Sequence, residues 1–334
     1  MNVLVTGGAG FVGSVCSEQL LASGHNVVVV DNLSTGHREA VSPAAVFAEG
    51  DFGDADFIRR IVLKHRISAL MHFAGETLVA KSMTDPRSYF QTNVRKGLDL
   101  LDVVVEQGVK KFIFSSTAAV YGEPLSTPIS EDHSTVPVNA YGESKLIFEQ
   151  ILEWYRRAYG LQYVALRYFN AAGASDEHGE DHDPESHLLP RILDCIQNQN
   201  QQFVIYGDDY PTSDGTCIRD YVHVLDISQA HILALEALED GGRNGAYNIG
   251  SSRGHSVREV QRTVEEVTGR HLDVRVGGRR AGDPAILVAS HERLVRELGW
   301  EPRFSSLSNI VQSAWDWKQK HPHGYTLPSV EAAR

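Results

Sequence analysis

The first half of the chain alternates short apolar runs with longer segments of helical spacing. The apolar runs occupy residues 2–6, 26–31, 67–74, 110–116 and 163–169. The helical patterns occupy residues 11–22, 54–66, 86–107 and 140–159. Because strands that are apolar throughout are buried on both faces, this order predicts an α/β fold, a Rossmann-type doubly wound parallel sheet covered by helices. We expect its crossovers to be right-handed.

After Asn170 the rhythm changes, and the remaining elements are shorter and more mixed. A helix at 225–239 and a strand at 246–250 suggest that the chain returns to the first domain before it finishes the second. We therefore predict an NAD-binding domain at 1–175 with a returning segment at about 222–250. A smaller mixed α/β substrate domain takes 176–221 and 251–325, and 326–334 is expected to be a flexible tail.

Composition narrows the possible functions. The chain has 334 residues, 42% apolar residues and a formal net charge of −12, which argues against a nucleic-acid-binding protein. Its cysteines (Cys16, Cys195 and Cys217) form neither a disulfide framework nor a metal-ligand pattern. The start "MNVLVTGG" enters a strand directly, and no apolar run approaches the ~18 residues of a membrane span. We expect a cytoplasmic protein.

A glycine-rich loop follows the first predicted strand. The stretch "VTGGAGFVG" contains Gly8-x-Gly10-x-x-Gly13 overlapping Gly7-x-x-Gly10-x-x-Gly13. Glycines in this place allow a tight turn and let the backbone approach a pyrophosphate at the positive end of the following helix. Asp31 ends the second strand, where a carboxylate would bind an adenosine ribose and repel a 2′-phosphate. The loop predicts a dinucleotide site that prefers NAD to NADP.

Tyr141 and Lys145 are four residues apart on a predicted helix and therefore share one face. A free tyrosine, with a pKa near ~10, is a poor base at neutral pH. We expect the nearby ammonium and a positively charged nicotinamide to lower that pKa, so that Tyr141 takes a proton from a sugar hydroxyl while hydride leaves the same carbon. Ser115, Ser116 and Thr117 end the preceding strand, and one of these hydroxyls could relay the proton.

Several further motifs reveal a family resemblance. The segments "TGGAGFVG", "HFAG", "SSTAAVYG", "YGESK" and "LRYFNAAGA", in this order, resemble the extended short-chain dehydrogenase/reductases. With "DGTCIRDYVHV", "YNIGS" and "GRRAGDPA" they are similar to the UDP-glucose 4-epimerases of that family, over about residues 1–325. The resemblance implies C4 oxidation on bound NAD, rotation of the 4-keto sugar and hydride return, which interconverts UDP-glucose and UDP-galactose. It also implies a homodimer, with 86–107 and 140–159 as the candidate interface helices.

The resemblance assigns roles residue by residue. Tyr141 matches the catalytic base, Lys145 its partner and Thr117 the hydroxyl. Besides Tyr141, Lys145 and Gly13 of the loop, the positions that match the NAD site are Gly7, Gly10, Phe11, Val12, Asp31, Asn32, Asp51, Phe52, Phe73, Ala74, Gly75, Asn93 and Phe169. Besides Thr117 and Tyr141, the positions that match the nucleotide-sugar site are Asn170, His187, Leu188, Phe203, Val204, Ile205, Arg219, Arg280 and Asp283.

Two departures from the family pattern bear on the cofactor and the sugar. Relatives usually carry a lysine after "HFAG", whereas this chain has Glu76 and Thr77, so NAD could be held less tightly or Lys81 could substitute. The segment "DPAILVA" is aliphatic around Ile286 and Leu287, which leaves N-acetylated UDP-sugars open as substrates. UDP-pentoses and UDP-uronates also stay open.

The loop at 176–187 raises a metal hypothesis, because it holds three histidines and several carboxylates. A metal site needs convergent geometry, which a polar run does not establish. We expect no metal and a solvated loop that contacts substrate. Dehydration is not expected, since Ala118 and Ala119 follow Thr117 where a dehydratase carries an acid. A non-catalytic NAD sensor would be expected to lack Tyr141 or its partners.

Overall fold

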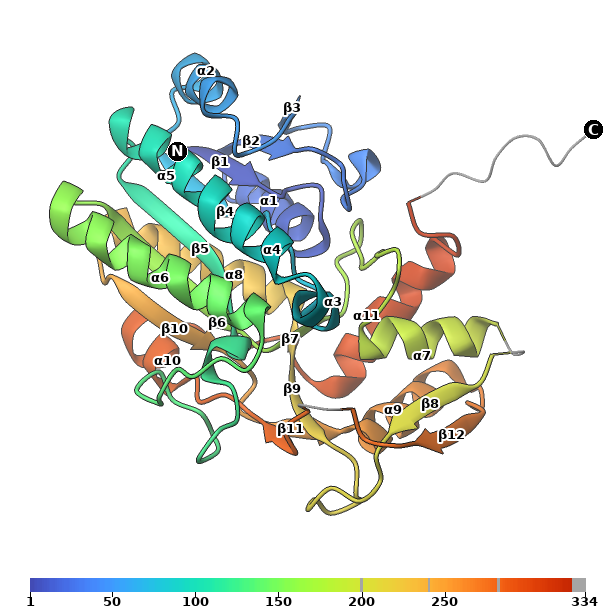
Figure 1. Ribbon diagram of the computed structural model, residues 1–334. Helices are drawn as coiled ribbons and strands as arrows, with labels where there is room; N and C mark the ends of the chain where they lie inside the picture. The colour runs from blue at the N-terminus through green and yellow to red at the C-terminus, as the bar shows by residue number, and fades with distance from the viewer. Residues whose placement is uncertain (199–200, 240, 281–282, 326–334) are drawn as a thin grey trace, which may run out of the picture.

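A parallel sheet forms the centre of the molecule, as the computed structural model shows (Figure 1). The structure describes residues 1–198, 201–239, 241–280 and 283–325. In this part of the chain, seven parallel strands pair in the order β10-β6-β5-β4-β1-β2-β3. Their bounds are Asn2–Thr6 (β1), Asn26–Asp31 (β2), Val46–Glu49 (β3), Ala69–His72 (β4), Lys111–Thr117 (β5), Gln162–Tyr168 (β6) and Gly245–Ile249 (β10). The predicted doubly wound sheet is confirmed.

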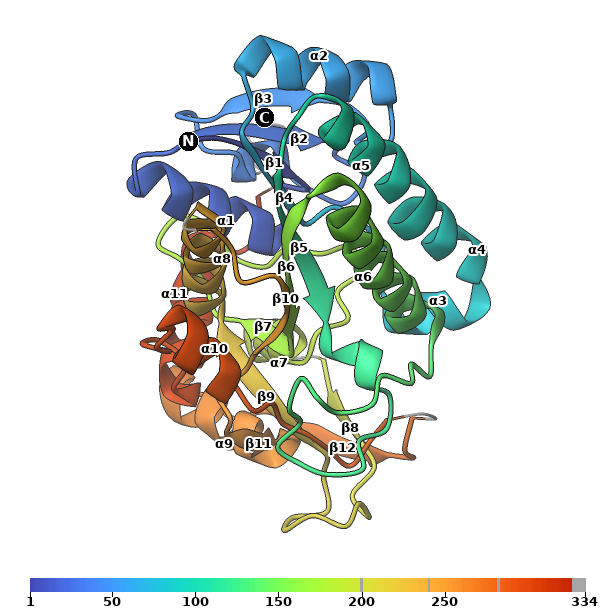
Figure 2. The same ribbon diagram turned by 90° about the vertical axis from the view of Figure 1, so that its left-hand side faces the viewer.

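Helices cover both faces of this sheet (Figure 2). Alternate residues of β1 point to opposite sides, so Val3 and Val5 join one core cluster and Leu4 joins the other. The helices on the first side are Phe11–Ala22 (α1) and Val224–Glu239 (α8). Those on the second side are Ala55–His65 (α2), Gly97–Glu106 (α5) and Ala140–Tyr159 (α6). Burial on both faces explains why the strands are apolar throughout.

The helix that carries Tyr141 begins and ends at residues that the sequence marks. The side chain of Asn139 accepts a hydrogen bond from Gly142 N and so caps α6, and Gly160 ends it with a φ of 70°. The α6 N-terminus faces the end of β5, where Ala118–Tyr121 (η3) follows Thr117. This arrangement brings the start of α6 to the carboxyl edge of the sheet.

The helix predicted at 86–107 is interrupted by a π-helical segment. Its parts are Pro86–Tyr89 (α4), Phe90–Lys96 (η2) and α5, preceded by Val79–Thr84 (α3). The wider turn holds Asn93, which is 3% exposed, against the loop after β4. Such segments occur often at functional sites, and periodicity alone does not reveal them because the apolar pattern continues across the insertion.

A second region lies below the carboxyl edge of the main sheet (Figure 1). Its strands are Asn170–Ala172 (β7), Ile218–His223 (β9), Gly254–Ser256 (β11) and Ile286–Leu287 (β13) in one sheet, with Phe203–Tyr206 (β8) and Val274–Gly277 (β12) paired in another. Its helices are Leu188–Gln197 (α7), Val257–Thr268 (α9) and Leu307–Lys320 (α11), which share one apolar core. Glu292–Leu298 (α10) and Arg38–Ala40 (η1) complete the elements.

The chain crosses between the two regions more often than the predicted domain ranges imply. The predicted return near 222–250 corresponds to α8 and β10, which belong to the main sheet layer. Within the range 1–175, however, β7 pairs with β9 of the second region. Leu294 and Trp300, from the range 251–325, pack in the core beside α1 and α8. The predicted tail at 326–334 lies outside the described residues.

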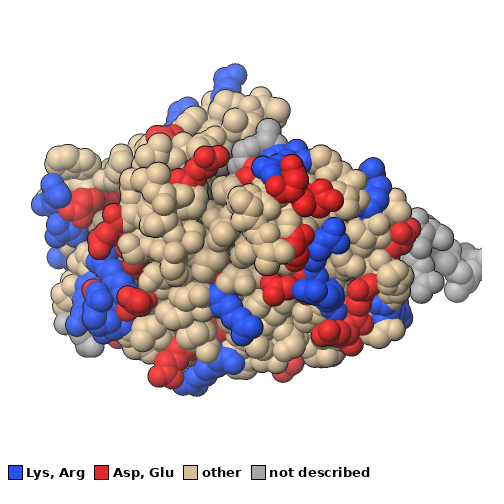
Figure 3. Space-filling model, turned by 90° about the horizontal axis from the view of Figure 1, so that it is seen from below, with Lys and Arg blue, Asp and Glu red and all other residues tan. Residues whose placement is uncertain are grey.

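The face at the bottom of Figure 1 carries mixed charge. Lys and Arg side chains are interspersed with Asp and Glu over this surface (Figure 3). A nucleic-acid-binding face would instead show a basic stripe or patch. Separately, within the described ranges, no helix is both long and apolar enough to cross a membrane.

Candidate functional site

The glycine loop forms a close-packed turn between β1 and α1. Gly7 has a φ of 74°, and a Cβ there would lie 2.5 Å from Ala74 N. A Cβ at Gly13 would lie 2.2 Å from Gly7 O, so the third glycine allows α1 to approach the turn. A Cβ at Gly10 would meet only Gly7 O, at 3.5 Å. Among the described residues, no side chain caps α1 at Gly10. The backbone N–H groups at the positive end of α1 are therefore left as donors for a ligand. This cradle fits a pyrophosphate.

Asp31 lies beside the glycine loop, as its place at the end of β2 predicts. Its Oδ2 accepts a hydrogen bond from Ala9 N at 3.0 Å, and its Oδ1 accepts one from Leu33 N at 2.9 Å. Asn32 follows, and its side chain accepts from Ser34 N. The carboxylate is thus fixed in orientation at the edge where an adenosine ribose would lie.

The second wall of the dinucleotide cradle is the loop after β4. Gly75 has a φ of 154°, and a Cβ there would lie 2.7 Å from Asn93 Oδ1 and 3.7 Å from Lys145 Nζ. Asn93 Oδ1 accepts from Glu76 N at 2.8 Å, and Nδ2 donates to Glu76 O and to Ser144 Oγ. Asn93 therefore joins the "HFAG" loop to α6. This structural role comes in addition to the contact with the cofactor that the resemblance implies.

The remaining positions assigned to the cofactor lie around the same edge. Asp51 forms an ion pair with Lys96 and accepts from Gly53 N. Phe73 packs against the ring of His231 with centroids 4.7 Å apart. The other positions are Phe11 and Val12 at the start of α1, Phe52 in the core beside α2, Ala74 against the glycine loop and Phe169 after β6.

Three hydroxyls end β5, and the structure separates their tasks. Ser115 Oγ is hydrogen-bonded to the Tyr168 hydroxyl, and Ser116 Oγ donates to the buried Glu149 carboxylate. The Thr117 hydroxyl instead accepts a hydrogen bond from Ala119 N, and it lies near enough to the phenol of Tyr141 to lower the pKa of that phenol in part. Of the three candidates, Thr117 is the one whose hydroxyl meets Tyr141.

The environment of Tyr141 differs from the sequence-based expectation. Burial raises the pKa of Tyr141 above its ordinary value, and the hydrogen bond with Thr117 offsets only part of this rise. Lys145 Nζ donates to Ser115 O at 2.9 Å beneath the strand. Burial also lowers the pKa of Lys145 to about 8, while the charge of Glu149 opposes this shift. In the protein alone the Tyr141 pKa is thus raised by burial, and its lowering by Lys145 and the nicotinamide together stays a prediction for the NAD-bound enzyme.

Arg219 and Asp283, both expected to bind the nucleotide sugar, meet in the second region. Arg219, in β9, donates from Nη1 to Ile218 O and Pro284 O, both at 2.9 Å, and its Nη2 lies 3.7 Å from Asp283 Oδ1. Arg280 stacks on Tyr206 at the end of β8, with its guanidinium carbon 4.2 Å from the ring centroid. Guanidinium groups held in this way are suited to bidentate contacts with phosphate.

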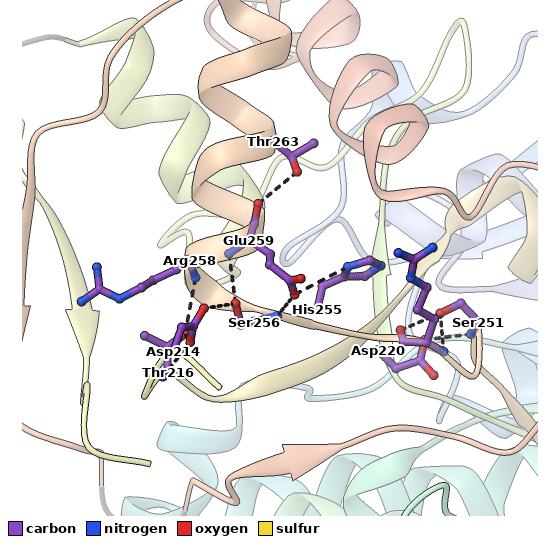
Figure 4. Close-up of polar contacts among 10 residues, drawn as sticks. Asp214, Thr216, Asp220, Ser251, His255, Ser256, Arg258, Glu259 and Thr263 are labelled. Atoms are coloured by element: carbon purple, nitrogen blue, oxygen red, sulfur yellow. Dashed lines mark hydrogen bonds and ion pairs between the residues drawn. The ribbon is translucent and has the colours of Figure 1, made fainter. Parts of the chain in front are cut away.

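The residue after Arg219 in β9 is a buried carboxylate, Asp220, which binds Ser251 (Figure 4). Asp220 is fully buried and accepts from Ser251 N and Oγ, from Ser252 N and from Ala289 N. Burial raises the pKa of Asp220 to about 6, although these donors lower it in part. Because Ala289 follows β13, the carboxylate ties β9 to the segment that carries Asp283. The sequence did not single out this residue, whose signal was a second charge directly after Arg219 in a strand.

The other substrate positions are more dispersed. Asn170 begins β7 and pairs with Tyr221, while Leu188 and the β8 residues Phe203, Val204 and Ile205 belong to or border the core of the second region. His187 lies in a separate cluster with Glu180, His182 and Glu185. The loop that carries this cluster is partly buried rather than fully solvated.

Glu76 and Lys81 form an ion pair at the rim of the cofactor cradle. Lys81 Nζ lies 3.0 Å from Glu76 Oε2, and both side chains are partly exposed. An exposed pair of this kind contributes about 0–1 kcal/mol to stability. Lys81 thus reaches the "HFAG" loop, as a substitute lysine would have to, but its charge is shared with Glu76.

Tyr89 is a neighbour of Tyr141 that sequence analysis did not name. Its ring meets that of Tyr141 edge to face, with centroids 6.4 Å apart, and its hydroxyl donates to Leu78 O. Tyr89 lies four residues before Asn93, which had been assigned to the cofactor site. In the helix predicted at 86–107 the two residues would share a face, and this spacing could have pointed to Tyr89.

Comparisons with known proteins agree with this geometry. The model of the NAD dependent epimerase/dehydratase family matches residues 3–250. The chain is 48% identical over 327 residues to a UDP-glucose 4-epimerase of Lacticaseibacillus casei, which covers 97% of this chain and 99% of the relative. A crystal structure of a UDP-glucose 4-epimerase matches with a TM-score of 0.95 and 47% identity, over 98% of this chain and 100% of the other. The UDP-glucose 4-epimerase from Brucella ovis in complex with NAD matches with a TM-score of 0.92 and 45% identity, over 94% and 97%.

Proposed function

Since the chain belongs to the NAD dependent epimerase/dehydratase family, we propose that it inverts C4 of UDP-glucose and UDP-galactose and so interconverts them. The chain is an NAD-dependent isomerase, and its relatives named UDP-glucose 4-epimerase match it over nearly their full length. The observation that carries the proposal is the packing of the "HFAG" wall of the glycine cradle against Ser144 and Lys145 of α6, the helix that carries Tyr141.

The cofactor is NAD, and the residues of the cradle fit it. The N–H groups at the start of α1 would hold the pyrophosphate, and Asp31 would accept from the adenosine ribose. Bound NAD supplies a hydride acceptor and, later, a hydride donor at C4 of the sugar. Lys145 and Asn93 lie under the "HFAG" wall and would fix the opposite end of the site.

Tyr141 would exchange the proton in both halves of the reaction. It takes the proton of the C4 hydroxyl as the C4–H bond breaks and hydride departs, which leaves a 4-keto sugar. When hydride returns to the other face of the turned sugar, Tyr141 gives the proton back to the C4 oxygen. The two halves cancel, so net redox change is zero. Thr117 is suited to hydrogen-bond the same oxygen and keep the proton path short.

The second region would hold the UDP group while the sugar turns. Arg219 and Arg280 supply the positive charge that a pyrophosphate requires in a chain whose net charge is −12. Asp283 and the carbonyl oxygens of Ile218 and Pro284 hold Arg219 in one orientation. A firmly bound nucleotide next to a loosely held hexose is what inversion at C4 needs.

The proposal includes a homodimer in the cytoplasm. Trp154 and Tyr159 of α6 are 65% and 60% exposed, a large aromatic surface for a helix that faces solvent in one copy of the chain. The three cysteines are free thiols, which fits a reducing compartment. Light scattering on wild type and Trp154→Glu tests the dimer, which the charged variant is expected to weaken.

The decisive test follows the sugar by NMR. Purified protein is incubated with UDP-galactose, without added NAD, and conversion to UDP-glucose is expected. UDP-N-acetylgalactosamine and a UDP-pentose in parallel samples rank the substrates. Tyr141→Phe, which keeps the ring but loses the proton acceptor, is expected to lower kcat by roughly 10²–10⁴-fold. If wild type converts none of the sugars even with NAD supplied, the proposed function is wrong.

A further inference from the structure

The loop before α7 gathers two carboxylates and two imidazoles at one point. These are Glu180, His182, Glu185 and His187, and one potential ligand atom from each lies within 4.8 Å of all the others. His187 Nδ1 is 2.6 Å from Glu180 Oε1 and 3.0 Å from Glu185 Oε1, and His182 Nδ1 is 3.5 Å from Glu180 Oε1. The convergence that the sequence could not establish is therefore present.

We propose that Glu180, His182, Glu185 and His187 bind one divalent transition-metal ion, for which Zn²⁺ is the best match. Two imidazole nitrogens and two carboxylate oxygens form a ligand set that zinc accepts in tetrahedral geometry. At metal–ligand distances of about 2.0–2.2 Å, the ligand atoms of a tetrahedron lie roughly 3.4 Å apart. The separations in the cluster, from 2.6 Å to 4.8 Å, bracket that value.

The hydrogen bonding of the cluster also favours an ion at its centre. His182 Nδ1 is buried and makes no hydrogen bond among the described residues, because its 3.5 Å approach to Glu180 Oε1 is an ion-pair contact only. His187 Nδ1 faces two carboxylates at once, although a ring nitrogen directs a single proton or lone pair. The Glu180 side chain is only 8% exposed, and a buried carboxylate requires a compensating positive charge, which a protonated His187 supplies when no ion is bound. One dication satisfies all four groups and balances the two carboxylates.

The surroundings leave room for an ion and hold one ligand in place. A small cavity of about 50 Å³ is lined by Glu180, His182 and Glu185 together with residues of α7 and α11. Glu185 Oε1 also accepts from Ser186 N and His187 N, which orients its carboxylate toward the cluster. Groups that orient a ligand from behind in this way strengthen metal sites.

The place of the cluster assigns the ion a structural task. Asp181, between two of the ligands, accepts from Tyr325 N and lies against His37, which follows β2. Gly179 N donates to the Tyr325 hydroxyl on the same side. The loop thus bridges the NAD-binding layer and the end of the chain after α11. Four protein ligands close the coordination shell, so the ion would hold the loop rather than activate a water.

Metal content measured on untagged holoenzyme tests the site. Wild type is loaded with Zn²⁺, dialysed against metal-free buffer and analysed by elemental mass spectrometry, and one zinc per chain is expected. His182→Gln and Glu180→Gln are expected to bind zinc at least roughly tenfold more weakly. Glu177→Gln, an exposed carboxylate of the same loop outside the cluster, is the matched control and is expected to keep the ion.

Two further measurements on wild type do not depend on how the variants fold. Replacing Zn²⁺ by Co²⁺ is expected to produce the intense visible bands of a tetrahedral site. Chelation is expected to lower the melting temperature, and added Zn²⁺ to restore it. Wild type that retains no more metal than His182→Gln, or that shows no tetrahedral Co²⁺ spectrum, would overturn the proposal and leave the cluster as an ion pair only.

Discussion

At the scale of single residues, the end of β5 separates catalysis from stability within three consecutive hydroxyls. Thr117 meets the phenol of Tyr141, whereas Ser116 completes a buried network with Glu149 and Arg167. Thr117→Val is expected to lower kcat by roughly 10²-fold, because it removes a hydroxyl beside the reacting oxygen. It also removes the cap on Ala119 N, which is expected to cost about 0.5–2 kcal/mol of stability. Activity assays and thermal melts on the same samples check this.

Ser116→Ala is the matched control for that substitution. It removes a donor from the buried Glu149 carboxylate, which is expected to cost about 1–3 kcal/mol of stability while kcat stays near wild type. A loss of kcat in Ser116→Ala as large as in Thr117→Val would contradict the separation of tasks.

Lys145 gives a pH-dependent prediction. Burial raises the pKa of Tyr141, so the fraction of phenolate, and with it kcat/KM, should rise with pH. Removal of the Lys145 cation in Lys145→Met takes away positive charge that favours phenolate, so the rising limb is expected to move to higher pH and the rate at neutral pH to fall. A profile of kcat/KM against pH measures both effects, and an unchanged midpoint would argue against an electrostatic role.

At the scale of elements, the π-helical segment positions the wall of the cofactor cradle. Asn93 reaches the "HFAG" loop and α6 because the wider turn directs it inward. Asn93→Ala is expected to cost about 1–3 kcal/mol of stability and to loosen NAD, since Glu76 N, Glu76 O and Ser144 all lose a partner. Gln91→Ala, exposed on the same segment, should change neither the melting temperature nor the NAD content after gel filtration.

At the scale of the whole molecule, the cofactor couples to the stability of the fold. NAD added to cofactor-free protein at about 100 times its Kd should stabilise the folded state by about 2.7 kcal/mol, which raises the melting temperature by several degrees. NADP should give a much smaller rise, because Asp31 repels a 2′-phosphate. Scanning calorimetry with both dinucleotides checks this, and equal shifts would refute the preference for NAD.

Local patterns were sufficient for much of the fold and for the core of the site. The helices 11–22 and 140–159 and the strand 26–31 were predicted with the bounds that the structure has. Period-3.6 and fully apolar runs report burial directly, and the glycine spacing reports a turn that only glycine allows. These signals depend on neighbours in the sequence, which is why they predict both α6 and the glycine loop.

By itself, the sequence determined the parallel sheet, the glycine cradle with Asp31, and the helical spacing of Tyr141 and Lys145. Only the tertiary structure decided what Ser115 and Ser116 bind, where Lys145 donates, and how Asp220 ties β9 to the segments around Ser251 and Ala289. It also brought the four groups of the loop at 180–187 together. The physical reason is that burial and hydrogen-bond partners come from segments far apart in the chain, and a pattern of residue types does not specify the distances between them.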